Sequence, residues 1–269
     1  MKKLLITFVM ILAISSSLMA VDVKEEGTSV IVKTAGYEVH WNKGAQMGYM
    51  QAFVAGSENS IIGVAGRAFY HSGEYGGAWH DWGGLQKWET VEKGGGKAVV
   101  KYISSDGVSK EFTCIATYYD SVPYIKHEFT VKNIGNDAIS SFQSGHSPMF
   151  EVNTDVEGMQ ANAQPFPYTV YWVKDGYYGG LYGPDAKEAV FMEWAPRNPG
   201  RMHLVHDNQA KQIKKGETST IVYYVAFGKG KMKEAVALAN DVQKEPSGGK
   251  AVSSQDSLST KWGWIRAGN

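Results

Sequence analysis

The chain has 269 residues, with 27 basic and 27 acidic side chains and one cysteine, Cys114. Balanced charge argues against a protein that binds nucleic acid regardless of sequence, because such proteins need a surplus of Lys and Arg. A single cysteine excludes a disulfide framework and a cysteine-rich zinc site. Hydrophobic residues make up 43% of the chain, enough for the core of one large domain or two small ones. The 31 glycines and 15 tyrosines predict many strands joined by tight turns.

The first twenty residues carry the pattern of an export signal. Lys2 and Lys3 precede an apolar run over residues 4–14, which is too short to span a membrane. A small residue, Ala20, ends the segment where signal peptidase would cut. We therefore expect a signal peptide over residues 1–20 and export to the periplasm or the extracellular space, with no membrane association once the signal is removed.

Strand patterns follow one another through the rest of the chain. Residues 124–132 alternate between an apolar face, which includes His127, and a polar face. Two β-rich runs, residues 97–103 and 110–119, are joined by a segment containing Asp106-Gly107, a strong signal for a hairpin turn. Further strands are expected at residues 37–41, 190–193 and 219–227.

Only one segment beyond the signal has a helical pattern. The apolar side chains of residues 231–244 fall largely on one stripe, and after residue 244 the composition is typical of a linker. No repeat of roughly 20–50 residues is visible, which disfavours propellers and solenoids. We predict an all-β fold, a large antiparallel β-sandwich over residues 21–244 that ends in a short C-terminal helix at 231–244. A polar tail with two tryptophans follows at 245–269.

Three clusters carry side chains suited to chemistry. The first contains Arg67 and, in a glycine-rich segment expected to be a loop, His80 and Asp81. Glycines let the backbone approach a ligand closely. The second cluster places His146 just beyond a strand and a turn. The third places Glu193 at the end of an apolar strand, where a carboxylate is either buried and paired or a base with a raised pKa.

Seven aromatic residues fall between Phe166 and Tyr182, among them Tyr171 and Trp172. Aromatic faces stack on the C–H faces of sugar rings, while Tyr and Trp keep a polar edge for hydroxyl groups. The alternative is that these residues are good strand formers that pack the sandwich. The density of rings in a glycine-containing stretch favours a carbohydrate-binding surface for the region as a whole.

The order of these clusters resembles that of the aldose 1-epimerases, or galactose mutarotases, and their galactose mutarotase-like relatives. The likeness extends over about residues 37–228. The matching segments are Val131-Lys132-Asn133-Ile134-Gly135, His146 to Val152, Val190-Phe191-Met192 before Glu193, and Lys215-Gly216-Glu217 before the last strand. The resemblance implies that family's antiparallel β-supersandwich and an enzyme that interconverts the anomers of a sugar without a cofactor.

The resemblance also implies roles for individual residues. His146 corresponds to the general acid that protonates the ring oxygen, and Glu193 to the base that removes the anomeric hydroxyl proton. Each such proton carrier is worth roughly 10²–10⁴-fold in rate. The expected substrate-binding residues are Arg67, His80, Asp81, Tyr171, Trp172 and Trp194. The expected ligand is a mono- or oligosaccharide, and no metal is expected, because the His80-Asp81 pair lacks a third ligand at a recognisable spacing.

Two other functions are compatible with the same sandwich, because one fold hosts many chemistries. A non-catalytic carbohydrate-binding module would use the aromatic stretch alone. A polysaccharide lyase or hydrolase would need a base and a group that neutralises a uronate, which Arg67, His71, Tyr75 and His80 offer.

The remaining histidines and the cysteine have less specific interpretations. His127 lies on the apolar face of its strand and is expected in the core, and Cys114 is expected to be inert packing. His203 and His206 are expected in a loop or on a rim. Residues three apart on a strand face opposite ways, so these two are not expected to share a ligand.

Overall fold

The computed structural model describes residues 21–43, 48–62, 69–75, 78–81, 84–139, 143–151, 156–162, 166–194, 197–206 and 212–245. For residues 69–75, 78–81, 143–151, 192–194 and 197–201 it describes the backbone alone. The predicted signal peptide, Arg67 and the tail beyond residue 245 lie outside the described residues.

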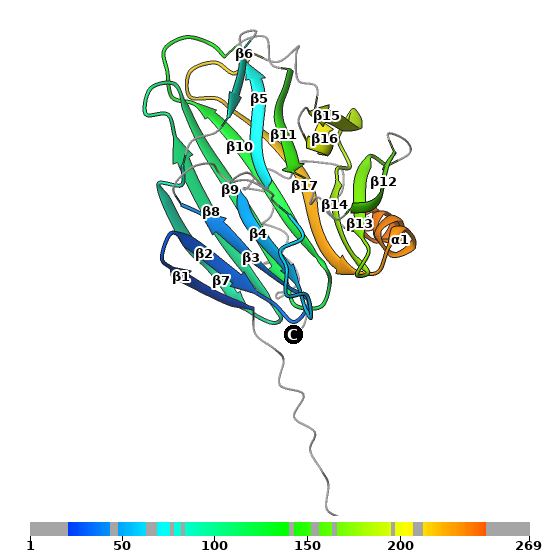
Figure 1. The fold of residues 1–269 in the computed structure, drawn as a ribbon. Helices are drawn as coiled ribbons and strands as arrows, with labels where there is room; N and C mark the ends of the chain where they lie inside the picture. The colour runs from blue at the N-terminus through cyan, green and yellow to red at the C-terminus, as the bar shows by residue number, and fades with distance from the viewer. Residues whose placement is uncertain are drawn as a thin grey trace, which may run out of the picture.

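An eight-stranded antiparallel sheet is the largest layer of the described fold (Figure 1). Its strand order is β12-β13-β14-β17-β10-β9-β8-β7. The strands are β7 (Lys87–Gly94), β8 (Lys97–Ser105), β9 (Lys110–Tyr119), β10 (Tyr124–Asn133), β12 (Val156–Asn162), β13 (Tyr168–Val173), β14 (Tyr177–Tyr182) and β17 (Thr218–Lys229). The strands predicted at 97–103, 110–119, 124–132 and 219–227 are confirmed as β8, β9, β10 and β17.

Two smaller antiparallel sheets complete the sandwich. One has the order β1-β2-β3-β4 and contains β1 (Asp22–Glu26), β2 (Ser29–Lys33), β3 (Tyr37–Asn42) and β4 (Tyr49–Val54). The other has the order β15-β16-β11-β5-β6. Its strands are β5 (Phe69–Tyr75), β6 (Ala78–Asp81), β11 (Gln143–Glu151), β15 (Glu188–Trp194) and β16 (Arg197–Val205).

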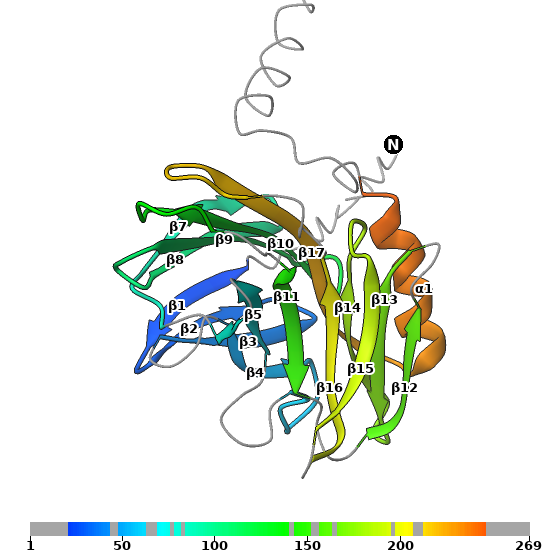
Figure 2. The same ribbon diagram turned by 90° about the horizontal axis from the view of Figure 1, so that it is seen from above.

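The two smaller sheets cover different halves of the large one, as Figure 2 shows. The four-stranded sheet lies over the half that contains β7 to β10. The five-stranded sheet contacts the other half through β12, β13 and β14. One hydrophobic cluster takes residues from all three sheets, so the core is continuous. The predicted all-β antiparallel sandwich is thereby confirmed.

The core under the four-stranded sheet is rich in aromatic side chains. Trp41 and Tyr102 stack with ring centroids 3.7 Å apart and an interplanar angle of 6°. His127 is fully buried there, as its place on the apolar face predicted, and Cys114 is a buried free cysteine. Offset or stacked aromatic pairs add to the free energy gained by burying their area, so this cluster joins the two sheets firmly.

The predicted C-terminal helix is present as α1 (Met232–Gln243), which packs beside β12, β13 and β14 on the face of the large sheet opposite the core (Figure 2). Its buried stripe consists of Ala235, Leu238, Ala239 and Val242. The Tyr182 hydroxyl donates a hydrogen bond of 2.6 Å to the carbonyl of Ala235. Strands β13 and β14 are therefore covered on both faces, by the helix on one and by the five-stranded sheet on the other.

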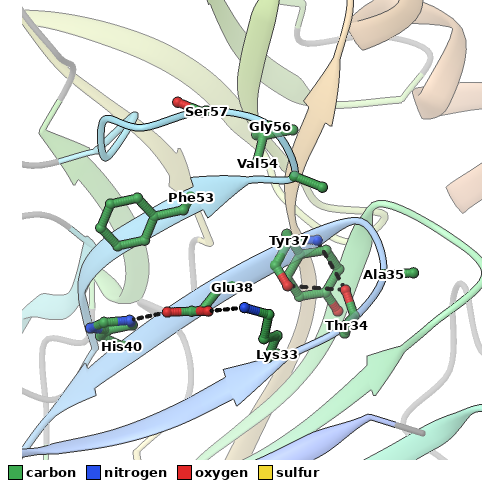
Figure 3. Close-up of a pocket in the computed structure, with 11 residues that line it drawn as sticks. Lys33, Thr34, Ala35, Tyr37, Glu38, His40, Phe53, Val54, Gly56 and Ser57 are labelled. Carbon is green, nitrogen blue, oxygen red and sulfur yellow. Dashed lines mark hydrogen bonds and ion pairs between the residues drawn. The ribbon is translucent and has the colours of Figure 1, made fainter. Parts of the chain in front are cut away.

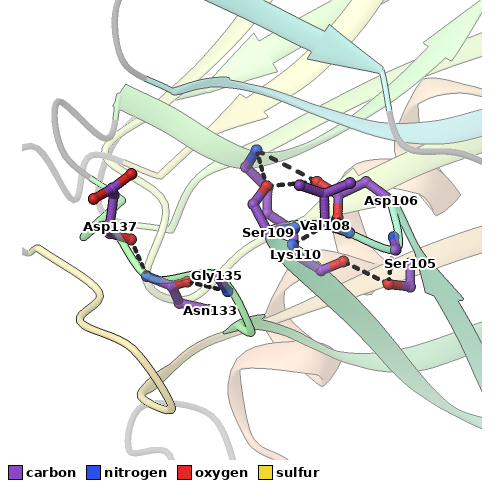
Figure 4. Close-up of polar contacts among 9 residues, drawn as sticks. Ser105, Asp106, Val108, Ser109, Lys110, Asn133, Gly135 and Asp137 are labelled. Atoms are coloured by element: carbon purple, nitrogen blue, oxygen red, sulfur yellow. Dashed lines mark hydrogen bonds and ion pairs between the residues drawn. The ribbon is translucent and has the colours of Figure 1, made fainter.

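The turn expected at Asp106 is built around that carboxylate (Figure 4). Its Oδ1 accepts hydrogen bonds from the backbone N–H groups of Val108, Ser109 and Lys110 at 2.7–2.9 Å. Gly107 has a φ of 72°, a left-handed conformation that favours glycine. The Asp-Gly signal thus marks a hairpin turn between β8 and β9, as the sequence predicted.

Asn133, part of the segment that resembles the epimerases, has a structural role in an adjacent turn (Figure 4). Its side chain is fully buried, and its Nδ2 donates to the carbonyls of Asp137 and Ile213, both at 2.8 Å. Its Oδ1 accepts from the backbone N–H of Gly135 at 2.9 Å. The Asn133-to-Gly135 part of the match is therefore accounted for by a turn that ties β10 to the segment before β17.

Candidate functional site

Five of the predicted site residues lie on the strands of one sheet. His80 and Asp81 are in β6, His146 is in β11, and Glu193 and Trp194 are in β15. In the order β15-β16-β11-β5-β6, these strands are the two edges and the centre of the five-stranded sheet. The expectation of a loop at His80 and Asp81 is wrong, since both are strand residues. His146 follows β10 and its turn, as expected, and is itself in the next strand, β11.

The register places His146 near the predicted hydroxyl-binding pair. Ser147, the residue after His146, pairs with Ser72 of β5, and Ser72 pairs with Asp81 of β6. His80 precedes Asp81 on the same strand. Strands two apart in a sheet have backbones about 10 Å from each other, so one end of the sheet gathers His146, His80 and Asp81.

Glu193 lies toward the opposite end of this sheet. His203 of β16 pairs with Val190 on one side and with Met149 on the other. From this row, His146 is three residues away in one direction and Glu193 three residues away in the other. Six residue steps in a regular sheet amount to about 20 Å along the strands. The register therefore does not bring the two predicted proton carriers around a single sugar ring.

The strand pairing is irregular at both predicted catalytic positions. The register of β11 against β5 shifts between Gln143 and Ser147, the interval that contains His146. The register of β15 against β16 shifts between Met192 and Trp194, which flank Glu193. β-Bulges are over-represented next to active sites, where they redirect a side chain. His146 thus lies within an irregular stretch of its own strand, and Glu193 lies opposite an irregular stretch of β16.

His203 lies in β16, between the edge strand β15 and the central strand β11 of the five-stranded sheet. Its neighbours Met202 and Leu204 are fully buried in the core, so alternation places His203 on the sheet's other face, where it is only 7% exposed. His206, just beyond the strand, is 3% exposed, and burial lowers its pKa to about 4. The expectation of a loop or rim position is wrong for His203, which is a buried strand residue. His206 does lie in the segment after the strand, as expected, but it is buried and not on a rim.

Sequence reasoning did not place His203 in a strand, although a signal for one was present. The residues around it, Met202 and Leu204, alternate with it as a half-buried strand requires. A histidine on the less apolar face of such a strand is a candidate for contact with a ligand. The position of His203 along the sheet, relative to His146 and Glu193, depends on pairing between distant segments. The local sequence does not show that pairing.

Tyr171 lies in the core and not on a surface. It is fully buried, and its hydroxyl donates a hydrogen bond to the carbonyl of Ile61. Four more rings of the aromatic stretch are at most 7% exposed: Phe166, Tyr168, Tyr178 and Tyr182. The stretch is therefore largely packing of the doubly covered strands β13 and β14, which was the alternative interpretation of the sequence.

Aromatic rings of this region lie over glycines on the neighbouring strand. Trp172 pairs with Gly158 across β13 and β12, and a Cβ on Gly158 would stand 2.3 Å from Cζ2 of the indole. Tyr171 pairs with Gly179 in the same way, and Tyr178 with Gly228. Trp172 itself is half-buried beside the helix. Close packing against glycine explains why this region is rich in both residue types.

A pocket of about 500 Å³ lies on the outer face of the four-stranded sheet (Figure 3). Lys33, Glu38 and Phe53 form one cross-strand row over β2, β3 and β4, and His40 is two residues beyond Glu38. The segment after β4, including Gly56 and Ser57, forms another wall. Sequence reasoning expected a strand at residues 37–41 but did not identify this site.

Charges within the pocket are paired. Glu38 Oε1 is 2.7 Å from His40 Nε2, and Glu38 Oε2 is 3.0 Å from Lys33 Nζ. Burial alone would raise the pKa of Glu38, but hydrogen bonding to His40 and Lys33 outweighs burial and the pKa is lowered. The carboxylate therefore stays ionised at neutral pH. The rings of His40 and Phe53 are tilted by 53° with centroids 5.4 Å apart.

Two further features bear on the kind of site. Within the described ranges, no three His, Cys, Asp or Glu side chains are grouped to hold a metal ion. No helix in the described part of the chain is long and apolar enough to cross a membrane.

No protein-family model matches this sequence, and no curated protein matches it significantly. Solved structures, however, share its fold. A GH36 α-galactosidase from Geobacillus stearothermophilus aligns over 81% of this chain with a TM-score of 0.55 and 10% identity. The aligned part is 42% of the galactosidase, so this chain spans less than half of that enzyme's length.

A proposed aldose 1-epimerase from Klebsiella pneumoniae is similar over more of its own length. It aligns over 84% of this chain and 87% of its own, with a TM-score of 0.54 and 8% identity. The galactosidase domain of an α-galactosidase-sucrose kinase gives a TM-score of 0.51 at 9% identity over 78% of this chain and 42% of its own. Together with the three antiparallel sheets and the single helix of the described residues, these likenesses show that the chain has a galactose mutarotase-like fold.

Proposed function

We propose that the protein binds a carbohydrate on the five-stranded sheet, with His203 at the centre of the site. The observation that carries this proposal is the gathering of His80, Asp81, His146, Glu193 and Trp194 on the strands of one sheet. The fold supports it, since structures that share it include galactosidases and a proposed aldose 1-epimerase.

The spread of these positions indicates a ligand longer than one sugar unit. His146 and Glu193 are separated by about 20 Å along the strands, and His203 is level with the midpoint between them. An oligosaccharide that follows the strand direction would span this length of the sheet. A monosaccharide would contact one end of the sheet.

Isothermal titration with galactose, lactose and a longer galacto-oligosaccharide tests this proposal. We expect affinity to rise with ligand length, and to fall in His203→Gln and in Trp194→Ala. The exposed residue Val108, at the tip of the β8–β9 hairpin, supplies the control variant Val108→Ala. No binding of any of the three sugars, or equal binding by the wild type and both site variants, would overturn the proposal.

A second candidate function is interconversion of sugar anomers, which the likeness to the Klebsiella protein and the two irregular strand positions favour. In this reaction an acid protonates the ring oxygen while a base removes the anomeric hydroxyl proton. The ring then opens to the aldehyde and closes on its other face. Of the predicted carboxylates, Asp81 lies nearer His146 in the register than Glu193 does.

Polarimetry on freshly dissolved galactose and glucose separates the two functions. A protein that only binds sugar leaves the spontaneous rate of mutarotation unchanged. Catalysis by the pair implied by the family resemblance requires His146→Ala and Glu193→Gln to lose the rate together. If catalysis occurs at the His146 end of the sheet, the catalysed rate of mutarotation should be lost in Asp81→Asn and retained in Glu193→Gln.

We further propose that the protein is exported with removal of residues 1–20. The charged start, the apolar run and the small residue Ala20 support this. The first strand begins soon afterwards, at Asp22. Mass spectrometry of the protein recovered from a periplasmic or culture fraction should give a chain that starts at Val21. A chain that retains Met1 in the cytoplasm would contradict the proposal.

A further inference from the structure

We propose that the pocket formed by Lys33, Glu38, His40 and Phe53 is a second carbohydrate site, which takes one neutral pyranose unit. It lies on the outer face of the four-stranded sheet and shares no residue with the five-stranded sheet. The proposal therefore stands independently of the site proposed above.

The size and lining of the pocket suit a small polar ligand. Its volume of about 500 Å³ falls within the range of roughly 300–1,000 Å³ that is usual for ligand pockets. Such pockets combine an apolar surface with a few convergent polar groups. Phe53 supplies a flat aromatic face, and the cross-strand row places Glu38 directly beside it (Figure 3).

Donors and acceptors remain for a ligand after the internal bonds are made. Each carboxylate oxygen of Glu38 has about two lone pairs and uses one, for His40 or for Lys33. The ammonium of Lys33 has three protons, one of which faces Glu38. An acceptor and a donor thus stand side by side, an arrangement that matches two adjacent hydroxyl groups of a sugar.

The charge balance favours a neutral ligand. The ionised Glu38 would repel an anion, and Lys33 would repel a cation, while the two partly cancel each other at a distance of 3.0 Å. A polyhydroxylated ring with one C–H face meets neither penalty. Its C–H face would lie on Phe53 while its hydroxyls exchange hydrogen bonds with Glu38 and Lys33.

Amide chemical-shift mapping by NMR, with galactose as the probe and galacturonate as its charged analogue, tests the inference. Galactose should move the amide signals of Lys33, Glu38 and Phe53, and galacturonate should do so no more strongly. Phe53→Leu keeps apolar bulk but removes the ring face, and it should weaken binding at this site by about tenfold. Glu38→Gln should weaken it as well, because an ionised acceptor is lost.

Strand β1 offers matched controls. Lys24 and Glu26 form an ion pair of 2.7 Å on the same sheet but do not line the pocket. Lys24→Met and Glu26→Gln should leave the galactose shifts of the pocket unchanged, whereas Lys33→Met should reduce them. The inference is overturned if galactose does not move these amides, if only galacturonate moves them, or if Phe53→Leu and Lys24→Met behave alike.

The outcomes for the two sites are separable. Loss of the pocket shifts in Phe53→Leu with retained oligosaccharide binding on the five-stranded sheet supports both proposals. If His203→Gln retains the chemical-shift changes in the pocket and the protein shows no other sugar binding, the proposed pocket site is supported and the proposed site on the five-stranded sheet is excluded. If sugar binding is weakened only by His203→Gln and not by Phe53→Leu, the proposed pocket site is excluded.

Discussion

The hydroxyl of Tyr49 lies 2.7 Å from Nε2 of His127, inside the core, and joins the four-stranded sheet to the large sheet. On the other side of the imidazole, Nδ1 is 2.8 Å from the hydroxyl of Tyr223. A neutral imidazole has one donor and one acceptor nitrogen, so two tyrosines suffice to satisfy both. The Tyr49 hydroxyl also lies 3.0 Å from that of Tyr118, which extends the buried network.

This arrangement predicts that the protein loses stability as the pH falls below about 6.5. Burial lowers the pKa of His127 to about 3 and that of His206 to about 4. Between those values and 6.5, the unfolded chain binds protons that the folded chain does not. Each histidine therefore removes roughly 1.4 kcal/mol of stability per pH unit in its window.

Urea denaturation at pH 7, 6 and 5 measures this loss. His127→Gln should be less stable at pH 7 but should show a shallower decline, because one of the two histidines no longer titrates. Equal declines in the wild type and in His127→Gln would mean that His127 contributes nothing to acid sensitivity.

Tyr49→Phe should destabilise the fold by about 1–3 kcal/mol, because it leaves a buried nitrogen of His127 without its partner. Tyr37 provides the matched control. It is 1% exposed, but its hydroxyl reaches the carbonyl of Tyr119 only at 3.5 Å. We expect Tyr37→Phe to cost less than about 1 kcal/mol in the same denaturation experiment. Similar losses in the two variants would argue against a special role of the network.

Strand β10, which has one covered face, was predictable from the sequence, whereas the aromatic residues of β13, which has two covered faces, were misread. Strand β10 alternates because one face meets the core, and the sequence shows that pattern directly. In β13, both faces are buried, since α1 and the five-stranded sheet cover them. The helix and the sheet that cover β13 come from distant segments of the chain. When the sequence is read locally, the rings of Tyr168 and Tyr171 therefore resemble an exposed aromatic surface.

The candidate site shows the same division. The sequence correctly places Glu193 at the end of an apolar strand, and it singles out His146. The sequence does not show how far apart His146 and Glu193 lie along the sheet. Their separation depends on long-range pairing through β16 and on the irregular register at both positions. The partners of Glu38 are hidden for the same reason, since Lys33 and Phe53 reach it only through pairing with β2 and β4.

Asp106→Ala should destabilise the β8–β9 hairpin by about 1–2 kcal/mol. The change removes the acceptor for three backbone N–H groups and for the hydroxyl of Ser109, which lies 2.6 Å from Oδ2. Comparable losses follow when a helix loses its capping residue. Asp137→Ala in the adjacent turn is the control, because Asn133 bonds to the carbonyl of Asp137 and not to its carboxylate. In thermal unfolding, the melting temperature of Asp106→Ala should be clearly lower than that of Asp137→Ala.

Gly158→Ala tests the contact between a glycine and the half-buried Trp172. A Cβ at position 158 would stand 2.3 Å from Cζ2 and 2.7 Å from Cε2 of the indole, so the ring or the edge strand β12 must shift. Overpacking of this kind typically costs about 1–3 kcal/mol. Gly36→Ala is the control, because the nearest atom to its Cβ would be the Thr34 hydroxyl oxygen at 4.0 Å. We expect a lower melting temperature and a shifted tryptophan emission in Gly158→Ala but not in Gly36→Ala. Unchanged emission together with unchanged stability would show that the indole does not rest on Gly158 in solution.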